Sequence, residues 1–576
     1  MAQANRTRKY DSRIDILKMI DGKVPADSLI LGGSIVNVAT GEIIKTGVAI
    51  KSGRIGAIGD YAKRFRGEST RVFDAEGLYL APGFVDAHLH VESSMLSPVR
   101  FSRLMAEKGV TTVFYDPHEI ANVSGLSGVS WMVEEMNKTP MNGFLTVPSC
   151  IPASSPSLET TGGKFGLEEI KEALDWETTA ALGEMMNFPG VLNREQGTIA
   201  KIKEALKREL PVEGHASGLA GEALDGYGSA GVDSDHESVT KSEGIERARK
   251  GFWTYVREGS GWADVSEVIR SLTETDISPT RFCLVTDDRD AGDLLEEGGV
   301  DHVIRRTIEE GVDPVEAIRM ATINPATRFR MDDNLGSLSP GRIADVNFVS
   351  DLGDLSVENT LLGGEPIKEI DWPETEASSL TDTVRVSEEI NSSLFDLSPD
   401  EKRFGIRVHG DDILTDRLDL ESDSYERDEL DFCTVLERHK LTGNVGRTMV
   451  EGFDLDGGAI ASTVAHDSHN LIVLGKEKTD MAIAANHLSS IGGGQVVVRS
   501  GEVEATVELP IAGLMSDARP EEVAESLADL KRAIEKIGCE IDQPLMILSS
   551  LALAVIPEVR ITDKGLVDVN NQELIA

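Results

Sequence analysis

The middle of the chain alternates short apolar runs with stretches whose apolar residues recur at helical spacing. One such helical stretch is NREQGTIAKIKEALKREL at 193–210. The eight apolar runs are 78–90, 110–119, 143–152, 180–187, 210–217, 231–238, 251–260 and 281–288. Because strand and helix signals alternate eight times, the pattern predicts an α/β protein built on a parallel (β/α)8 barrel, TIM-like, over about 81–340.

Different patterns flank this region. Residues 28–60 and 340–369 consist of short apolar segments separated by glycine-rich turns, which predicts one small β-sheet domain built from both. From 385 onward, β-branched segments and helical stretches indicate a separate α+β domain. We therefore expect four divisions: an N-terminal segment with the first part of the small β domain (1–80), the barrel (81–340), the second part of that domain with a polar linker (341–384), and the C-terminal domain (385–576).

In seven of the eight runs, the last four residues include a His, Asp or Glu. The C-terminal ends of barrel strands are where enzymes of this fold assemble their chemistry. A His, Asp or Glu buried there would carry an uncompensated desolvation cost unless it shared a partner. A metal ion is the partner that serves several such residues at once.

Six of these residues form the predicted ligand set. His88 and His90 are two positions apart, so in a strand both imidazoles project from one face. The other four are Glu184, His215, His236 and Asp287. Six ligands are too many for one catalytic ion that keeps a water position, whereas two ions bridged by Glu184 account for them. Imidazole and carboxylate suit Mn²⁺, Fe²⁺ or Zn²⁺. The alternative is six ordinary polar groups of the core or surface.

Composition limits the possible partners and the cellular compartment of the protein. With 99 acidic against 57 basic residues, the formal charge is -42, which disfavours nucleic-acid and membrane-surface partners. Such a surface resembles those of proteins from salt-in halophiles, where counterions screen the repulsion. The four cysteines show no CxxC spacing, and we find no signal peptide and no apolar run of about 20 residues. We expect a cytoplasmic protein.

Seven motifs together carry a resemblance to a known family. They are PGFVDAHLHVESSM (82–95), YDPHEIANV (115–123), GEMMN (183–187), GHA (214–216), SDHE (234–237), TDDR (286–289) and AHDSHN (465–470). The first, with the later His, His and Asp, is similar to the amidohydrolase superfamily. The full set resembles its adenine deaminase branch, over about residues 15 to 570.

The resemblance implies hydrolytic deamination of adenine to hypoxanthine and ammonia, as in purine salvage. A hydroxide bridging two divalent metals, commonly manganese or iron, would attack C6 of the purine. The implied partners are the small molecules adenine and water, and a homo-oligomer is usual for the superfamily. The alternative is another binuclear amidohydrolase acting on a cyclic amide or a related C–N bond.

Two residues are predicted to move protons. Asp287, beside the hydroxide, is placed to accept its proton. Many relatives carry HxxE on strand five, but residues 215–218 read His-Ala-Ser-Gly and lack that glutamate. We therefore expect Glu119, at the end of the second run, to protonate N1 of the purine. The alternative for Glu119 is a solvated glutamate at a helix start.

Further residues are candidates for contact with the substrate. By the resemblance, Asp288 binds the imidazole ring of the purine; alternatively it only stabilises a helix start through the helix dipole. His118 and Glu92 either face the substrate or orient a ligand. His466 and His469 either close over the barrel mouth or organise a turn.

Overall fold

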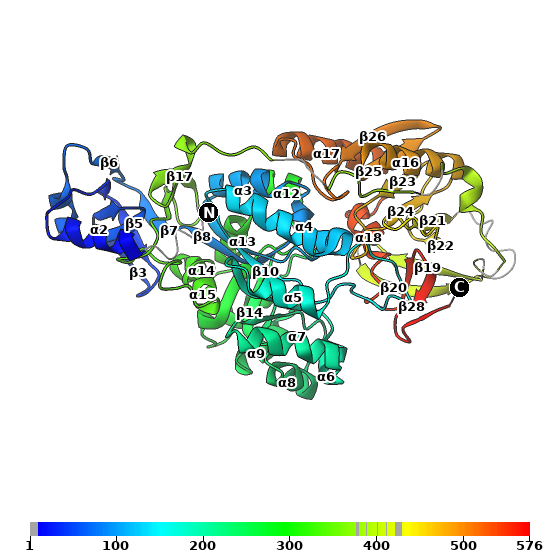
Figure 1. Cartoon of the computed structure of the whole chain (residues 1–576), viewed down its shortest axis with the longest axis horizontal. Coiled ribbons are helices and arrows are strands. Elements are labelled where there is room, and N and C mark those ends of the chain that lie inside the picture. The colour runs from blue at the N-terminus through cyan, green and yellow to red at the C-terminus, as the bar shows by residue number, and fades with distance from the viewer. Residues whose placement is uncertain are drawn as a thin grey trace.

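The computed structural model describes residues 10–375, 380–386, 389–399, 401, 403–410, 412–420 and 429–575. Residues 1–9 of the expected N-terminal segment and 376–379 of the expected linker lie outside the described residues. The small β region lies at one end of the molecule, the barrel in the middle, and the C-terminal sheet at the other end (Figure 1). Among the described residues, no helix combines the length and apolarity needed to cross a bilayer.

The small β region contains two sheets, and one of them combines strands from residues 28–60 with strands from residues 340–369. One sheet has the order β5-β4-β1-β6 and the other β18-β17-β16-β7-β2-β3. The elements are α2 (Tyr10–Ile20), β1 (Ser28–Leu31), β2 (Ser34–Asn37), β3 (Glu42–Lys45), β4 (Val48–Lys51), β5 (Arg54–Ile58), β6 (Arg71–Asp74), β7 (Tyr79–Pro82), β16 (Val346–Val349), β17 (Val357–Leu362) and β18 (Glu365–Pro366). Gly32, with a φ of 84°, allows the turn that takes the chain from β1 in the first sheet to β2 in the second.

Eight parallel strands form the barrel, which confirms the predicted fold class. They are β8 (Phe84–Leu89), β9 (Val110–Tyr115), β10 (Asn142–Val147), β11 (Thr179–Met185), β12 (Val212–Gly214), β13 (Ser234–Asp235), β14 (Trp253–Arg257) and β15 (Phe282–Val285). They pair as β12-β11-β10-β9-β8 and β13-β14-β15. A parallel bridge between Leu89 and Asp287 joins the last strand to the first. At the other seam, Gly214 N–H donates to Ser234 Oγ at 2.9 Å.

The apolar run at 78–90 is two strands instead of one. β7 ends at Pro82 in the small β region, and β8 begins at Phe84 in the barrel. Gly83 lies between them, where a Cβ would be 2.2 Å from Thr111 Oγ1. Only glycine fits at this close approach, so the first barrel strand starts later than the apolar pattern indicates.

Helices cover the outside of the barrel between successive strands (Figure 1). They are α3 (Pro98–Glu107), α4 (His118–Lys138), α5 (Leu167–Leu174), α6 (Phe188–Leu192), α7 (Gln196–Lys207), α8 (Gly221–Ser229), α9 (Lys241–Arg249), α10 (Val265–Val268), α11 (Arg270–Thr273), α12 (Ala291–Glu296), α13 (Val300–Glu309), α14 (Pro314–Met320) and α15 (Ile323–Arg328). In α13, Val300, Val303, Ile304 and Thr307 are buried. This spacing places one apolar stripe against the barrel.

The C-terminal region is a mixed sheet flanked by helices. Its order is β20-β19-β22-β21-β24-β23-β25-β26. The elements are β19 (Phe404–His409), β20 (Asp412–Asp419), β21 (Leu430–Leu436), β22 (Val445–Glu451), β23 (Ala459–Ser462), β24 (Leu471–Gly475), α16 (Lys478–Ile491), β25 (Gly494–Arg499), β26 (Glu502–Glu508), α17 (Pro520–Lys536), α18 (Pro544–Ser550), β27 (Val559–Thr562), β28 (Gly565–Asp568) and β29 (Glu573–Leu574). The loop from β23 to β24 contacts the barrel mouth, as the next section describes.

Candidate metal centre

The six predicted ligands lie together at the C-terminal ends of the barrel strands. His88 is in β8 and Glu184 is in β11, and each of the other four directly follows a strand or comes within two residues of one. All except His215 are at most 5% exposed. The fold therefore gathers residues that are far apart in the sequence into one buried cluster.

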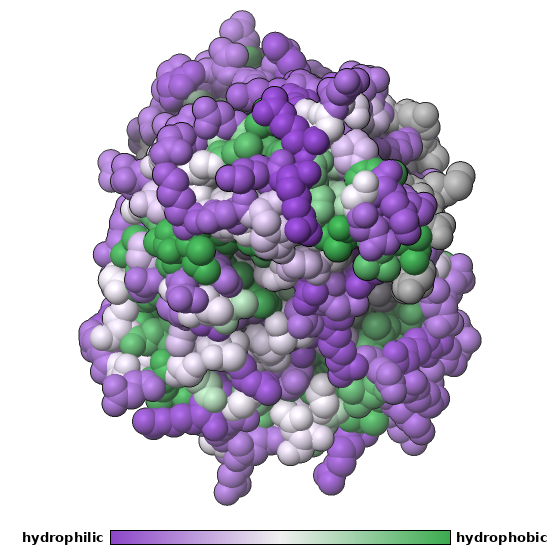
Figure 2. Space-filling view, turned by 90° about the vertical axis from the view of Figure 1, so that its left-hand side faces the viewer, coloured by the Kyte–Doolittle hydropathy of each residue, from purple (hydrophilic) through white to green (hydrophobic). Residues whose placement is uncertain are grey.

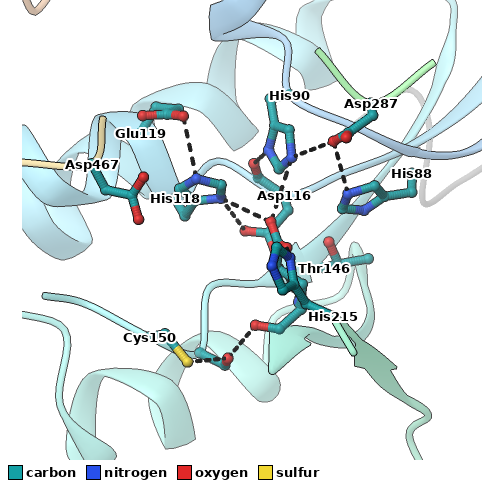
Figure 3. Close-up of polar contacts among 12 residues, drawn as sticks. His88, His90, Asp116, His118, Glu119, Thr146, Cys150, His215, Asp287 and Asp467 are labelled. Carbon is teal, nitrogen blue, oxygen red and sulfur yellow. Dashed lines mark hydrogen bonds and ion pairs between the residues drawn. The ribbon is translucent and has the colours of Figure 1, made fainter. Parts of the chain in front are cut away.

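The tautomer of His90 indicates a ligand. Its Nδ1 lies 2.8 Å from the carbonyl oxygen of Asp116, which can only accept, so Nδ1 carries the hydrogen. In the neutral ring Nε2 then presents a lone pair, and it faces Asp287 Oδ1 at 3.2 Å (Figure 3) and Glu184 Oε1 at 3.5 Å. Three electron-pair donors directed at one another need a proton or a metal ion between them, and the neutral ring is the form that binds a metal.

His88 completes this side of the cluster. Its Nε2 is buried, lies 3.3 Å from Asp287 Oδ1, and has no hydrogen-bond partner among the described residues. Burial, and then the neighbouring His236, lower the pKa of His88 to about 4. A neutral imidazole with an unused buried nitrogen is a competent metal ligand.

Glu184 faces both sides of the cluster. Its Oε2 lies 2.7 Å from His215 Nδ1 and 3.3 Å from His236 Nε2, whereas Oε1 faces His90. Donor atoms close enough to share one ion occur in the groups His88–His236–Asp287, His88–His90–Glu184 and Glu184–His215–His236. The residues present therefore fit two adjacent divalent cations with Glu184 common to both.

Asp287 has an unusual backbone. Its φ is 57°, in the left-handed region. Its N–H donates to the carbonyl of His88 at 3.1 Å, and its carbonyl accepts from His90 N–H at 3.3 Å. These bonds hold Oδ1 toward the two histidines, while Arg257 Nη1 lies 3.1 Å from Oδ2.

Glu119 lies in the first turn of α4, four residues after β9 ends at Tyr115. The alternative of a solvated glutamate at a helix start is correct in its position but wrong about solvation, because Glu119 is only 2% exposed. Its Oε1 lies 2.8 Å from His466 Nδ1 and 3.2 Å from His118 Nε2, and its Oε2 contacts His469 Nε2. Although burial alone would raise the pKa of Glu119, the facing histidines hold it well below the usual range.

Asp288 and Glu92 lie beside this group. Asp288 accepts a hydrogen bond from Ser93 Oγ. It is not at a helix start, since α12 begins at Ala291 with Asp290 as its N-cap, so the helix-dipole alternative is wrong. Glu92 is buried, accepts from Ile120 N–H at 3.2 Å, and has its pKa raised to about 7, mainly by burial.

Two cavities meet at these residues. One of about 440 Å³ lies over the predicted ligands, and Leu553, Val555, Ile556 and Pro557 of the C-terminal region also line it. The other, of about 80 Å³, lies between the barrel and the C-terminal sheet. Glu119, Asp288 and His466 line both. His118, whose Nδ1 is 3.3 Å from Glu184 Oε1, also lines the larger cavity.

Known families match most of the chain. The amidohydrolase family matches residues 79–367, and the adenine deaminase C-terminal domain matches residues 413–573. The chain is 41% identical to an adenine deaminase of Moorella thermoacetica, 40% to one of Clostridium botulinum (Type A) and 41% to one of Ruegeria sp., in each case over 96% of both chains. The chain belongs to the adenine deaminase family of amidohydrolases. The predicted family resemblance is therefore confirmed.

Two residues of this adenine deaminase family member were missed by the sequence reasoning. Asp116 is fully buried and accepts from Glu184 N–H at 3.0 Å, which fixes the backbone beside the shared carboxylate. Arg257, at the end of β14, contacts Glu237, Asp264 and Asp287. The available signal was position: each lies among the last four residues of an apolar run.

Proposed function

We propose that this protein catalyses the hydrolytic deamination of adenine to hypoxanthine and ammonia. The observation that carries the proposal is the combination of a full-length likeness to adenine deaminases with all six metal-fitting donors in one buried cluster. The amidohydrolase match alone would leave the substrate open. The match to the adenine deaminase C-terminal domain favours adenine over other cyclic substrates.

We further propose that His88, His90, Glu184, His215, His236 and Asp287 hold two Mn²⁺ ions, a donor set that also suits Fe²⁺ or Zn²⁺. When bound, such ions lower the pKa of water from 15.7 toward about 7 and so provide a nucleophile at neutral pH.

The protein's own residues direct the protons. Asp287 accepts the proton of the attacking water and passes it to the leaving amine, which departs as ammonia. Arg257 restrains Oδ2 of Asp287 during this transfer. Glu119 delivers a proton to N1 of the purine, so that the ring can accept electrons when the C6–O bond forms.

Binding is assigned to Asp288, His118 and Glu92. Asp288, held by Ser93, accepts an N–H from the five-membered ring of adenine. His118 and Glu92 flank Glu119 and fix its direction relative to the ring. Burial of Asp288, His118 and Glu92 beneath the C-terminal region excludes bulk water and strengthens the polar contacts of these three side chains.

The test uses protein loaded with Mn²⁺, with adenine loss and ammonia release followed beside adenosine and dihydroorotate. We expect turnover of adenine alone, two metals per chain, and loss of both metal and activity in His90→Ala and Glu184→Ala. Turnover of dihydroorotate instead would overturn the substrate, and absence of bound metal would overturn the site.

We also propose a cytoplasmic homo-oligomer. All four cysteines are buried and none of them is in a disulfide, which suits a reducing compartment. Light scattering of the purified protein measures the assembly, and a mass equal to one chain would contradict it.

A further inference from the structure

One cluster outside the predicted ligand set joins two distant parts of the chain. Glu119, in the barrel, contacts His466 and His469, which lie in the loop between β23 and β24. Glu119 and His469 are 350 residues apart in sequence. Glu119 and His466 line both cavities, and His469 lines the smaller one.

The hydrogen of His469 can be placed from its neighbours. Ala465 N–H donates to His469 Nδ1 at 3.2 Å, so Nδ1 accepts and Nε2 carries the ring hydrogen. That hydrogen points to Glu119 Oε2. Burial is the main reason why the pKa of His469 is lowered to about 4, which keeps the ring neutral.

The surroundings hold His469 in this position. The ring is fully buried and the residue has a φ of 51°, in the left-handed region. Arg438, itself fully buried, donates to the carbonyl of His469 and to the carbonyl of Ala512. A non-glycine residue keeps such a backbone only where its neighbours determine it, so the ring has one fixed direction.

This arrangement decides which oxygen of Glu119 can carry a proton. Oε2 already accepts the hydrogen of His469, so a proton on Glu119 must be on Oε1. Oε1 lies 2.8 Å from His466 Nδ1 and 3.2 Å from His118 Nε2. The group that supplies this proton is therefore one of these two histidines.

His466 is better placed than His118 to supply it. The side chain of His466 is 12% exposed and borders both cavities, so it reaches cavity water. His118 turns its other nitrogen toward Glu184 and Asp116 in the buried cluster. Glu119, and after it Asp288 and Asp467, raise the pKa of His466 to about 9 against the effect of burial, so that it is an imidazolium at neutral pH.

The hydrogen on Nε2 of His469 disfavours a metal ion at this cluster. Glu119, His466 and His469 are close enough to share an ion. A metal on Nε2 of His469 would displace its hydrogen while Nδ1 still accepts from Ala465, which would require an imidazolate. The geometry fits proton transfer instead.

We propose that the C-terminal domain completes the proton-delivering group of the active site, with His469 positioning Glu119 and His466 reloading it. The proposal rests on the proposed function, in which Glu119 protonates N1 of adenine. The Nδ1–H bond of His466 breaks as an O–H bond forms at Glu119 Oε1. That O–H bond then breaks as N–H forms at N1. When the C6–OH group of the addition product becomes the C=O of hypoxanthine, its O–H bond breaks, and this second proton of the attacking water returns to His466 through cavity water.

The test compares substitutions at the two histidines in the full-length, metal-loaded protein. His466→Asn keeps a polar atom near Nδ1 but cannot carry the proton, and we expect kcat to fall about 10- to 100-fold with KM within about twofold. His469→Leu should lower kcat similarly, and His469→Gln, which restores an N–H donor, should recover most of it. The control is His487→Gln, because the ring of His487, in α16, lies outside the cluster and contacts Thr506 Oγ1 of β26 at 3.1 Å.

Two readouts separate proton supply from a structural role. Activity of His466→Ala should rise with added imidazole, in proportion to its protonated form. In a Glu119→Gln background, His466→Asn should cost nothing more, because His466 acts through Glu119. Metal content and melting temperature should match the parent.

Failure of the proposed function and failure of the inference about the C-terminal domain give different experimental results. If the parent protein does not deaminate adenine, the proposed function fails. If it does, but the His466 and His469 variants behave like His487→Gln, or their losses add to that of Glu119→Gln, the inference about the C-terminal domain is overturned. Loss of metal in these variants would also overturn it, since the role would then be structural.

Discussion

Asp287 and His469 share a backbone conformation that ordinary residues seldom adopt. Their φ values are 57° and 51°. Non-glycine residues in this region cost of order 1–3 kcal/mol and persist where the surroundings fix them. Both side chains point into the cluster around the barrel mouth, so backbone strain is located where side-chain direction matters most. Nothing in the sequence marks either residue as left-handed.

Glu159, another buried carboxylate, allows a test of how the stability of the protein depends on pH. Glu159 accepts from Ser154 N–H at 3.0 Å and lies near Asp467 and Asp563, and burial is the main cause that raises its pKa from 4.5 to about 7. The folded state therefore holds this proton more tightly than the unfolded state, so stability falls as pH rises from about 4.5 to about 7 and stays reduced above that.

Glu159→Gln removes this charge and keeps the acceptor. We expect the variant to be more stable than the parent by about 3 kcal/mol at pH 8 and equal to it at pH 4.5. Calorimetric melting at both pH values measures the difference, with the exposed Glu168→Gln as control. An equal gain at both pH values would contradict the assignment.

At the scale of elements, the sequence predicted the repeated strand–helix units. It did not predict features that depend on contacts between residues distant in the chain. Eight alternations located eight strands, and the residues after them located the six donors. The start of β8 was missed because it depends on the contact of Gly83 with Thr111. The sequence left open whether His466 and His469 close over the barrel mouth. It did not indicate their contact with Glu119, since no local pattern encodes contacts between distant segments.

β11 depends on a second glycine. At Gly183 a Cβ would lie 2.1 Å from Asp116 Oδ2 and 2.9 Å from the carbonyl of Val147. Gly183→Ala should therefore destabilise the protein by roughly 1–3 kcal/mol and, by displacing Glu184, lower its metal content. Gly197→Ala in α7 is the matched control, because no atom lies within 4 Å of its Cβ. Equal melting temperatures and metal content in the two variants would contradict this reading.

At the scale of the whole molecule, charge dominates. The net charge is -42, and the face at the small β end is largely hydrophilic with scattered apolar patches (Figure 2). At low ionic strength the carboxylates repel one another over about 10 Å, and salt shortens that range. This repulsion opposes the compact state more than the unfolded one.

We therefore expect the melting temperature to rise by several degrees between 0.1 and 2 M KCl. Sucrose at equal osmolality separates charge screening from general exclusion effects. A melting temperature that is flat or falls with KCl would show that the acidic surface does not limit stability.

The 350 residues between Glu119 and His469 also set an order of events during synthesis. At about 5–20 residues per second, a ribosome takes roughly 20–70 s to travel from one codon to the other. All six predicted metal ligands emerge within the first 287 residues, before either histidine of the loop. A nascent chain thus presents its metal-fitting residues well before the partners of Glu119 exist. With the proposed roles of His466 and His469, docking of the last-made sheet is the step that completes the active site.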